Sequence, residues 1–342
     1  MLPSIASAFA LFLLFIIGLS FSNFSQNENN SSDLASSSES SGEEILSDKL
    51  MENKEISDAS METESMNLAA DAVYQDDVGD REVLTYPIPD ENVQVLVPIS
   101  ILVSNPDHLS KFDLYKQHIE DVINQTNGDL SDYLPIDPST FTYDSEQKIV
   151  QVNLKDNISN FGSHSEEFFH TLVSQQLETI GAVKMAFYTK GNEGAILGNR
   201  VETEIDYKPL ENRGYFLLES TMDEEKALYV PFEKPFESID QALDAMKNNI
   251  DTHGLVASIP DTINIAEITE DRSEKQLIIR LSNGSKLEEN RRTINAIESI
   301  LLTAKDFNFS SVKFENTNIK EVGEFILTDK LLVPIAANKM DL

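Results

Sequence analysis

The feature that most constrains the fold is an order of strand-like and helix-like stretches that occurs twice. In the first half, apolar side chains alternate over Val93–Val97 and then recur at helical spacing from Phe112 to Ile123. The following stretches are, in order, two strand-like, one helix-like and one strand-like, at residues 141–143, 150–154, 163–180 and 183–187. This half therefore predicts the order β-α-β-β-α-β.

The second half repeats the plan. Its stretches are strand, helix, strand, strand, helix and strand, at residues 228–231, 238–250, 263–265, 277–281, 294–304 and 312–314. Matching features lie 125 to 133 residues apart, as Gly198 does from Gly323 and Val97 from Val230. We expect a tandem duplication of the α+β class, with ferredoxin-like order, in domains 81–207 and 208–342. The competing interpretation is a chance recurrence of common elements.

An uncharged apolar run, Ile5–Phe21, lies near the N-terminus. At a rise of about 1.5 Å per residue it extends about 25 Å, and neighbouring residues can complete a bilayer crossing. We therefore predict a membrane anchor over residues 1–24, with the lipid bilayer contacted through Ile5 to Phe21. A cleaved signal peptide is the alternative, but the first basic residue is Lys49, so no basic segment precedes the run.

An acidic stretch follows this run. Residues 28–80 carry 15 acidic and two basic side chains among many Ser and Asn residues, so we predict a disordered stalk over residues 25–80. The whole chain has a formal net charge of −33, which opposes binding to nucleic acid. It has no Cys, which excludes disulfides, thiolate metal sites and a Cys nucleophile.

Residues that carry catalytic or metal-binding chemistry are sparse. The two closest of the five histidines, His164 and His170, lack the i, i+4 spacing of a zinc site on a helix, and His170 is expected at a helix edge. Asn249, Asp251 and Gly254 resemble the start of a calcium loop, but Pro260 stands where a Glu ligand is required. We assign no catalytic, cofactor-binding or metal residues and predict a non-enzyme.

Several longer segments resemble one family. Residues 228–246 (LYVPFEKPFESIDQALDAM) and 297–339 are similar to the C-terminal portion of the Bacillus anti-sigma-X factors, and residues 95–101 and 194–199 are more weakly similar. Domains of that family are related to the GerM sporulation and germination type. The resemblance implies a single-pass protein with extracytoplasmic C-terminal domains. Such a protein restrains an extracytoplasmic-function (ECF) sigma factor and releases it upon envelope stress.

The chain departs from this pattern at Met1. The sigma-binding segment of such proteins precedes the membrane helix, yet here the apolar run begins almost at once. Our leading hypothesis is the sensor module of an anti-sigma factor that lacks its N-terminal cytoplasmic part. The alternative is an exported GerM-like protein, acting as a binding protein in sporulation, germination or the cell wall.

Overall fold

The computed structural model describes residues 68–126, 128–132, 134–158, 166–220 and 227–342. Residues 62–342 belong to one unit. The predicted anchor, most of the predicted stalk, and Ser163 and His164 lie outside the described residues.

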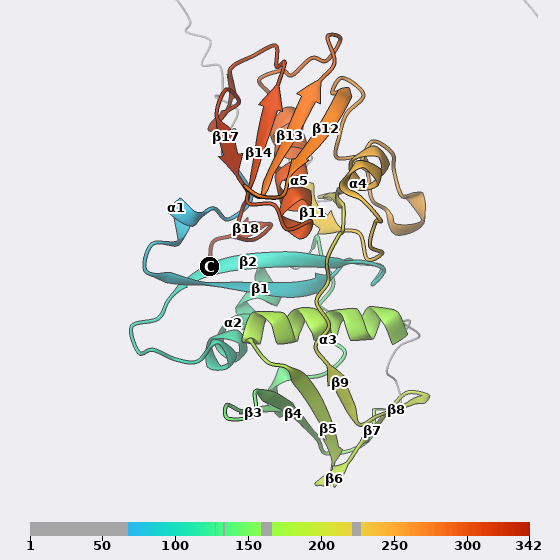
Figure 1. Cartoon of the computed structure of the whole chain (residues 1–342). Helices are drawn as coiled ribbons and strands as arrows, with labels where there is room; N and C mark the ends of the chain where they lie inside the picture. Colours follow the sequence, from blue (N-terminus) through green and yellow to red (C-terminus); the bar gives the residue numbers. More distant parts are fainter. Residues whose placement is uncertain (1–67, 127, 133, 159–165, 221–226) are drawn as a thin grey trace, which may run out of the picture. The chain divides into compact units, whose positions relative to one another are not determined.

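The first half contains two antiparallel hairpins and two long helices (Figure 1). Its main elements are β1 (Arg81–Pro89), β2 (Leu96–Ser104), α2 (Lys111–Thr126), β3 (Phe141–Asp144), β4 (Ile149–Leu154), α3 (Glu166–Ile180) and β5 (Lys184–Thr189). Strands β1 and β2 form one hairpin and β3 and β4 the other, while β5 runs parallel to β4. Four short strands follow, β6 (Asn192–Glu193), β7 (Ala195–Leu197), β8 (Arg200–Glu202) and β9 (Glu204–Asp206). Of these, β6 and β9 pair with β5.

The second half has the same plan. Its main elements are β10 (Tyr215–Glu219), β11 (Ala227–Pro231), α4 (Ile239–Ala245), β12 (Ile265–Asp271), β13 (Gln276–Leu281), α5 (Arg291–Asp306) and β14 (Ser311–Glu315). Again two hairpins form, and β14 runs parallel to β13. The short strands β15 (Glu321–Val322), β16 (Phe325–Ile326), β17 (Lys330–Leu332) and β18 (Lys339–Met340) follow, with β17 beside β14.

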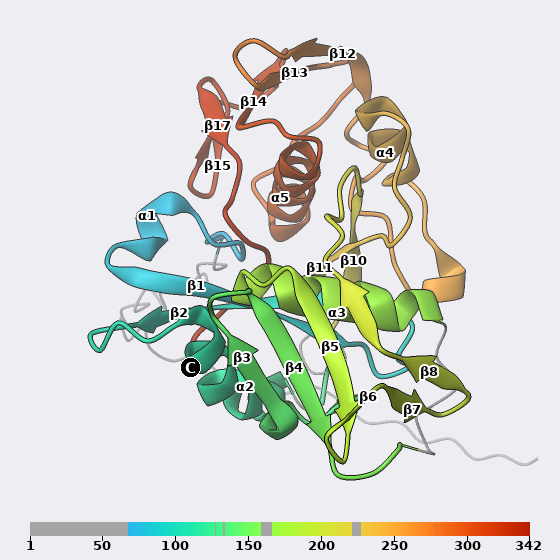
Figure 2. The same ribbon diagram turned by 60° about the horizontal axis from the view of Figure 1, so that its bottom comes forward.

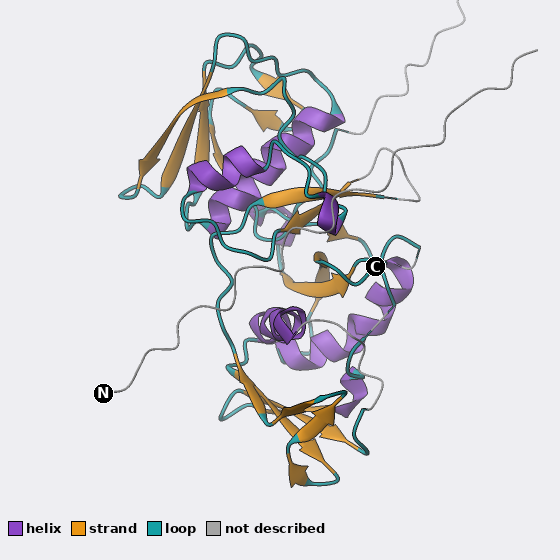
Figure 3. Ribbon diagram, turned by 90° about the vertical axis from the view of Figure 1, so that its right-hand side faces the viewer, coloured by secondary structure: helices purple, strands orange, loops and turns teal. Residues whose placement is uncertain are grey.

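Each half therefore places a helix between a hairpin and a sheet. Helix α3 contacts β1 on one side and β5 and β9 on the other (Figure 2). Helix α5 likewise contacts the β10–β11 hairpin and β14, and Figure 3 shows helices packed against the sheets of both halves. The β1–β2 hairpin and the β10–β11 hairpin contact each other through β2 and β11. Apolar burial on both faces of α3 and α5 is the main stabilising force of this arrangement.

The repeat also appears in turn geometry, at an offset of 127 residues. Asp144 and Asp271 each end a strand, and each carboxylate accepts hydrogen bonds from the amides two and three residues further on. Lys148 and Lys275 each close the turn with a positive φ, 57° and 48°. Their carbonyl oxygens both accept an amide from the loop that follows α3 or α5. These turns support the predicted duplication.

The predicted order β-α-β-β-α-β is extended by one strand in each half, because β1 and β10 pair with the first predicted strand. Strands β1 and β2 form a sheet with β18, separate from the sheet of β3, β4, β5 and β6. A single ferredoxin-like sheet per domain is therefore wrong, while the mixed α+β class with tandem repeats is confirmed. The missed signal is the alternation of the apolar residues Leu84, Tyr86 and Ile88, which are buried in β1.

Two predicted elements have different ends. The strand expected over 93–97 begins at Leu96, because the Asp90 carboxylate accepts the amides of Asn92, Gln94 and Val95 and so fixes a turn. The helix capped by Ser238 is present, with the Ser238 hydroxyl accepting the Gln241 amide, but it ends at Ala245. Residues 246–248 form a turn and a bend, and Val256 further along the chain pairs with Leu217 of β10.

Residues 68–80, predicted as stalk, belong to the folded body. Ala72 and Val73 are fully buried, Val73 pairs with Ala336, and a short helix α1 (Gln75–Val78) precedes β1. The composition of residues 25–80 as a whole hid this short apolar segment, because acidic residues on both sides dominate its average.

Candidate functional site

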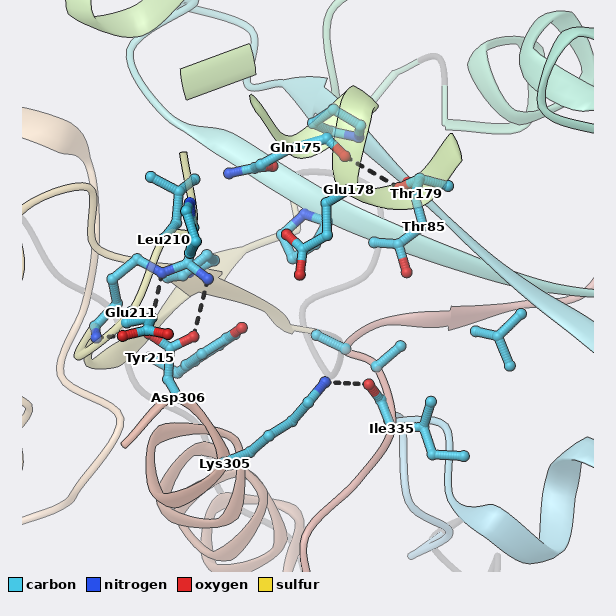
Figure 4. Close-up of a pocket in the computed structure, with 18 of the residues that line it drawn as sticks. Thr85, Gln175, Glu178, Thr179, Leu210, Glu211, Tyr215, Lys305, Asp306 and Ile335 are labelled. Atoms are coloured by element: carbon cyan, nitrogen blue, oxygen red, sulfur yellow. Dashed lines mark hydrogen bonds and ion pairs between the residues drawn. The ribbon is translucent and has the colours of Figure 1, made fainter. Parts of the chain in front are cut away.

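A cavity of about 340 Å³ lies where the two halves meet (Figure 4). Its walls come from β1 and β2, the last turn of α3, the loop 207–213, the last turn of α5, and residues 335–337. Pro98 and Pro231, which occupy matching positions of the two repeats, both line it. The cavity is therefore formed by the duplication itself.

A buried ion pair fixes one wall. The Arg213 guanidinium donates from Nε and Nη2 to the two carboxylate oxygens of Asp306, at 3.1 and 2.9 Å, and its backbone amide donates to the same carboxylate at 2.6 Å. Both side chains are about nine-tenths buried, at 11% and 9% exposure. Such a bidentate pair holds the loop 207–213 on the end of α5.

Two further charged side chains face the open space of the cavity from opposite walls. Glu178 extends from α3 and Lys305 from α5, and Figure 4 shows both ends directed into the same space. Burial raises the pKa of the Glu178 carboxyl, although Arg213 and Lys305 act to lower it. Burial also lowers the pKa of the Lys305 ammonium, which donates a hydrogen bond to the Ile335 carbonyl oxygen. Each charge thus lacks full solvation.

The wall that carries Glu178 is held to the first hairpin. The Thr179 hydroxyl donates to the Thr85 carbonyl oxygen of β1 at 2.5 Å. The same hydroxyl lies 3.1 Å from the Gln175 carbonyl oxygen, one turn back on α3. This contact sets the position of the last turn of α3, and with it the direction of Glu178.

A second buried carboxylate lies on α5, next to the described start of the chain. The Glu298 side chain accepts the amides of Asp71 and Ala72, both at 2.9 Å, and the Tyr229 hydroxyl at 2.7 Å. Glu298 has no exposed surface, and its burial raises the pKa of the carboxyl to about 7. It fastens residues 70–74, which lie within the predicted stalk 25–80, to the second half.

Residues 335–339 complete this fastening. The amide of Ile335 donates to the Val73 carbonyl oxygen at 2.7 Å, and the amide of Lys339 donates to that of Asp71 at 2.6 Å. Buried Asn338 joins the two hairpins, since its side-chain amide donates to the carbonyl oxygens of Pro98 and Tyr229, both at 2.8 Å. Residues 335–337 also line the cavity, so one segment contacts the cavity, both halves and residues 70–74.

The residues weighed for catalysis or metal binding stay apart. His170 lies on α3 with Nε2 3.6 Å from a carboxylate oxygen of Glu202. Asp251 begins a short 3-10 helix that Gly254 ends in the left-handed region. Within the described residues, no group of three or more His, Asp or Glu could hold a metal ion. Among the same residues, the helices are too short or too polar to cross a membrane.

From the sequence we predicted no site residue, so Glu178, Lys305 and Glu298 were not identified in advance. Glu298 had a signal, because it interrupts the apolar stripe of residues 294–304 with one acid. No sequence signal distinguishes Glu178 and Lys305, since they are single charges at helix ends in an acidic chain.

The fold is of a GerMN-like tandem type. The structure is similar to the tandem GerMN domains of the sporulation protein GerM from Bacillus subtilis, with a TM-score of 0.50 and 12% sequence identity. The likeness covers 76% of this chain and 99% of that chain, and at this identity it shows the fold alone.

Sequence comparison gives the narrower relation. Residues 75–205 match the family model of the anti-sigma-X factor RsiX central domain. The chain is also 24% identical over 350 residues to the anti-sigma-X factor RsiX of Bacillus subtilis (strain 168), covering 99% of this chain and 86% of that protein. The predicted resemblance to the anti-sigma-X factors is confirmed.

Proposed function

We propose that this chain is the sensor module of an anti-sigma factor that restrains an ECF sigma factor, and that its two GerMN-type repeats form this extracytoplasmic sensor. The observation that carries the proposal is the similarity to anti-sigma-X factor RsiX along 99% of the chain. A role in regulation through binding also agrees with the sparse catalytic chemistry of the sequence.

In this proposal the protein is a single-pass membrane protein. Ile5 to Phe21 crosses the bilayer, the acidic stretch leads outward, and domains 81–207 and 208–342 fold outside the cytoplasm. The fastening of residues 70–74 to Glu298 and to residues 335–339 supports a sensor role. It gives the folded body a direct connection to the segment that leads toward the membrane.

A reporter strain tests the anti-sigma role. The gene with its upstream coding sequence is deleted in a strain that carries a reporter driven by the neighbouring sigma factor. Reporter output is expected to rise, and to fall again when the gene is restored. Unchanged output after deletion would contradict the role.

Fusions at residue 342 test the location independently. Alkaline phosphatase fused there is expected to be active, because that enzyme folds only outside the cytoplasm, and a cytoplasmic reporter fused at the same point is expected to be inactive. The mass of the membrane-bound protein shows whether residues 1–24 are retained. The opposite pattern of fusion activities would contradict the proposed location.

The second candidate function is an exported GerM-like protein of sporulation, germination or the cell wall. The structural likeness to the tandem GerMN domains favours it. The upstream DNA separates the two candidates. An in-frame segment rich in Lys and Arg beside a sigma-factor gene supports the regulator, whereas a stop codon directly upstream supports the exported protein.

A further inference from the structure

The cavity between α3 and α5 has a charge balance unlike that of the chain. The whole sequence has 26 basic and 59 acidic residues. The cavity is lined by three of each, namely Lys111, Arg213 and Lys305 with Glu178, Glu211 and Asp306. A neutral lining in a strongly acidic protein disfavours an occupant with a large net charge.

Four of these six charges form no ion pair among the described residues, and Glu178 and Lys305 are the two that extend into the open space in Figure 4. Arg213 and Asp306 satisfy each other. Among the described residues, Glu178 has no cation within 4 Å, and Lys305 has no carboxylate within that distance. Both side chains are exposed to the cavity, and Lys305 uses one of its three protons on the Ile335 carbonyl. One anion and one cation therefore face each other across open space without pairing.

Proline rings make part of the remaining surface stiff, beside polar side chains such as Thr85, Gln175 and Thr179. Pro87 and Pro98 face each other in the β1–β2 register, and Pro209 and Pro231 add two more rings to the lining. Proline rings offer no amide donor and fix their own backbone, so this part of the wall keeps its shape. The cavity volume of about 340 Å³ is that of a small-molecule site, for which about 300–1,000 Å³ is typical.

We propose that this cavity binds a small zwitterion, a free amino acid or a short peptide, with its ammonium group at Glu178 and its carboxylate at Lys305. The proline rings contact the apolar part of the ligand. The pKa directions agree, because burial disfavours the charged form of both groups and an occupant would add an opposite charge beside each.

The site deepens the sensor role and rests on it for its biological meaning, but its chemistry can be tested alone. A ligand carboxylate at Lys305 competes with the Ile335 carbonyl oxygen for the ammonium protons. Ile335 also donates to Val73, so the occupant acts directly on the contact that holds residues 70–74.

Calorimetric titration of the full chain in detergent micelles tests the proposal. The probes are alanine, phenylalanine, dialanine and trialanine, with N-acetylalanine and alaninamide as controls that lack one charge. At least one zwitterion is expected to bind with a Kd below about 10 mM, and the two controls at least about tenfold more weakly. Preference for alanine or phenylalanine identifies a free amino acid, and preference for the peptides a peptide terminus.

Variants show whether the binding is at this site. Glu178→Gln and Lys305→Met are each expected to weaken binding at least about tenfold. Glu167→Gln, on an exposed part of α3, and Lys330→Met, exposed on β17, are expected to bind as the unchanged protein does. Circular dichroism melting confirms that all four variants fold.

Three results would overturn the proposal: no binding of any zwitterion up to about 10 mM, equal binding of the singly charged controls, or undiminished binding by both cavity variants. None of these measurements uses a sigma factor. Failure here thus leaves the reporter test of the anti-sigma role unaffected, and a negative reporter test leaves the binding result standing.

Discussion

Glu298, in the middle of α5, accepts the backbone amide of Ala72 at 2.9 Å across 226 residues of sequence. Its other carboxylate oxygen accepts the amide of Asp71. A fully buried acid therefore supplies the acceptors for two adjacent backbone amides of the segment that residues 335–339 also hold. An amide buried without an acceptor costs about 1–3 kcal/mol, which makes this contact a sensitive point of the fold.

Removing this acceptor should destabilise the protein. Glu298→Ala leaves the amides of Asp71 and Ala72 unpaired and opens a void, so we expect a loss of about 2–4 kcal/mol in the free energy of unfolding by urea. Hydrogen exchange at these two amides should become faster. Glu289→Ala, at an exposed position beside α5, is the control and should change little. Equal stability of the two variants would show that Glu298 does not hold the segment.

The pKa of Glu298 predicts a specific pH dependence. A carboxyl whose pKa rises from 4.5 to about 7 on folding binds its proton more tightly in the folded state. Its stabilising contribution is therefore full below about pH 4.5 and is lost as the pH rises to about 7. Because many other acids also titrate, the quantity to measure is the difference in unfolding free energy between the unchanged protein and Glu298→Gln. That difference should fall by up to about 3 kcal/mol across this range, and a flat difference would contradict the prediction.

Position 338 should require the side-chain amide of Asn. Its side-chain nitrogen donates to the carbonyl oxygens of Pro98 and Tyr229, and Asp cannot donate there when ionised. Asn338→Asp should therefore lower the free energy of unfolding at neutral pH by about 2–4 kcal/mol. The measurement is a thermal melt, in which the melting temperature should fall. Asn283→Asp is the matched control, because Asn283 is exposed and accepts a hydrogen bond from Asn316, which Asp preserves. A control that destabilises as much as Asn338→Asp would refute the explanation.

Gly323 and Gly79 form a matched pair for a test of close packing. Both glycines have a positive φ, 53° and 54°, at which an Ala side chain is strained. At Gly323, however, an added Cβ would lie 2.3 Å from the Leu68 carbonyl oxygen, whereas at Gly79 it meets nothing within 4 Å. Gly323→Ala should lose clearly more stability than Gly79→Ala in thermal melts, and similar losses would show that Leu68 yields without cost.

Local periodicity predicted most of the regular elements. Helices α2 and α5 and strands β4 and β13 lie where apolar spacing placed them, because each buries one face or stripe. The pairing of the strands was harder to predict from the sequence. Nothing local distinguishes a β2 that joins the β3–β5 sheet from a β2 that pairs with β1 and β18, since that choice depends on contacts across the whole chain.

The cavity could not be predicted from spacing, because its charged residues come from separate elements of both halves. Glu178 and Lys305 are 127 residues apart and occupy equivalent ends of α3 and α5 in the two repeats. The sequence indicated the duplication. It did not indicate that the two copies direct these helix ends toward each other. Glu298 was more accessible to reasoning, as an acid within an apolar helical stripe needs a buried partner.

Residues 335–339 have a consequence for how the molecule is made. They follow every other part of the described fold in sequence except residues 340–342, yet Val73 and Asp71 depend on them for hydrogen bonds. During synthesis, residues 71–73 must therefore wait for more than 250 residues before these partners emerge. These hydrogen bonds thus form only in a chain whose two repeats have both been made, so a partly synthesised molecule cannot hold residues 71–73 in place.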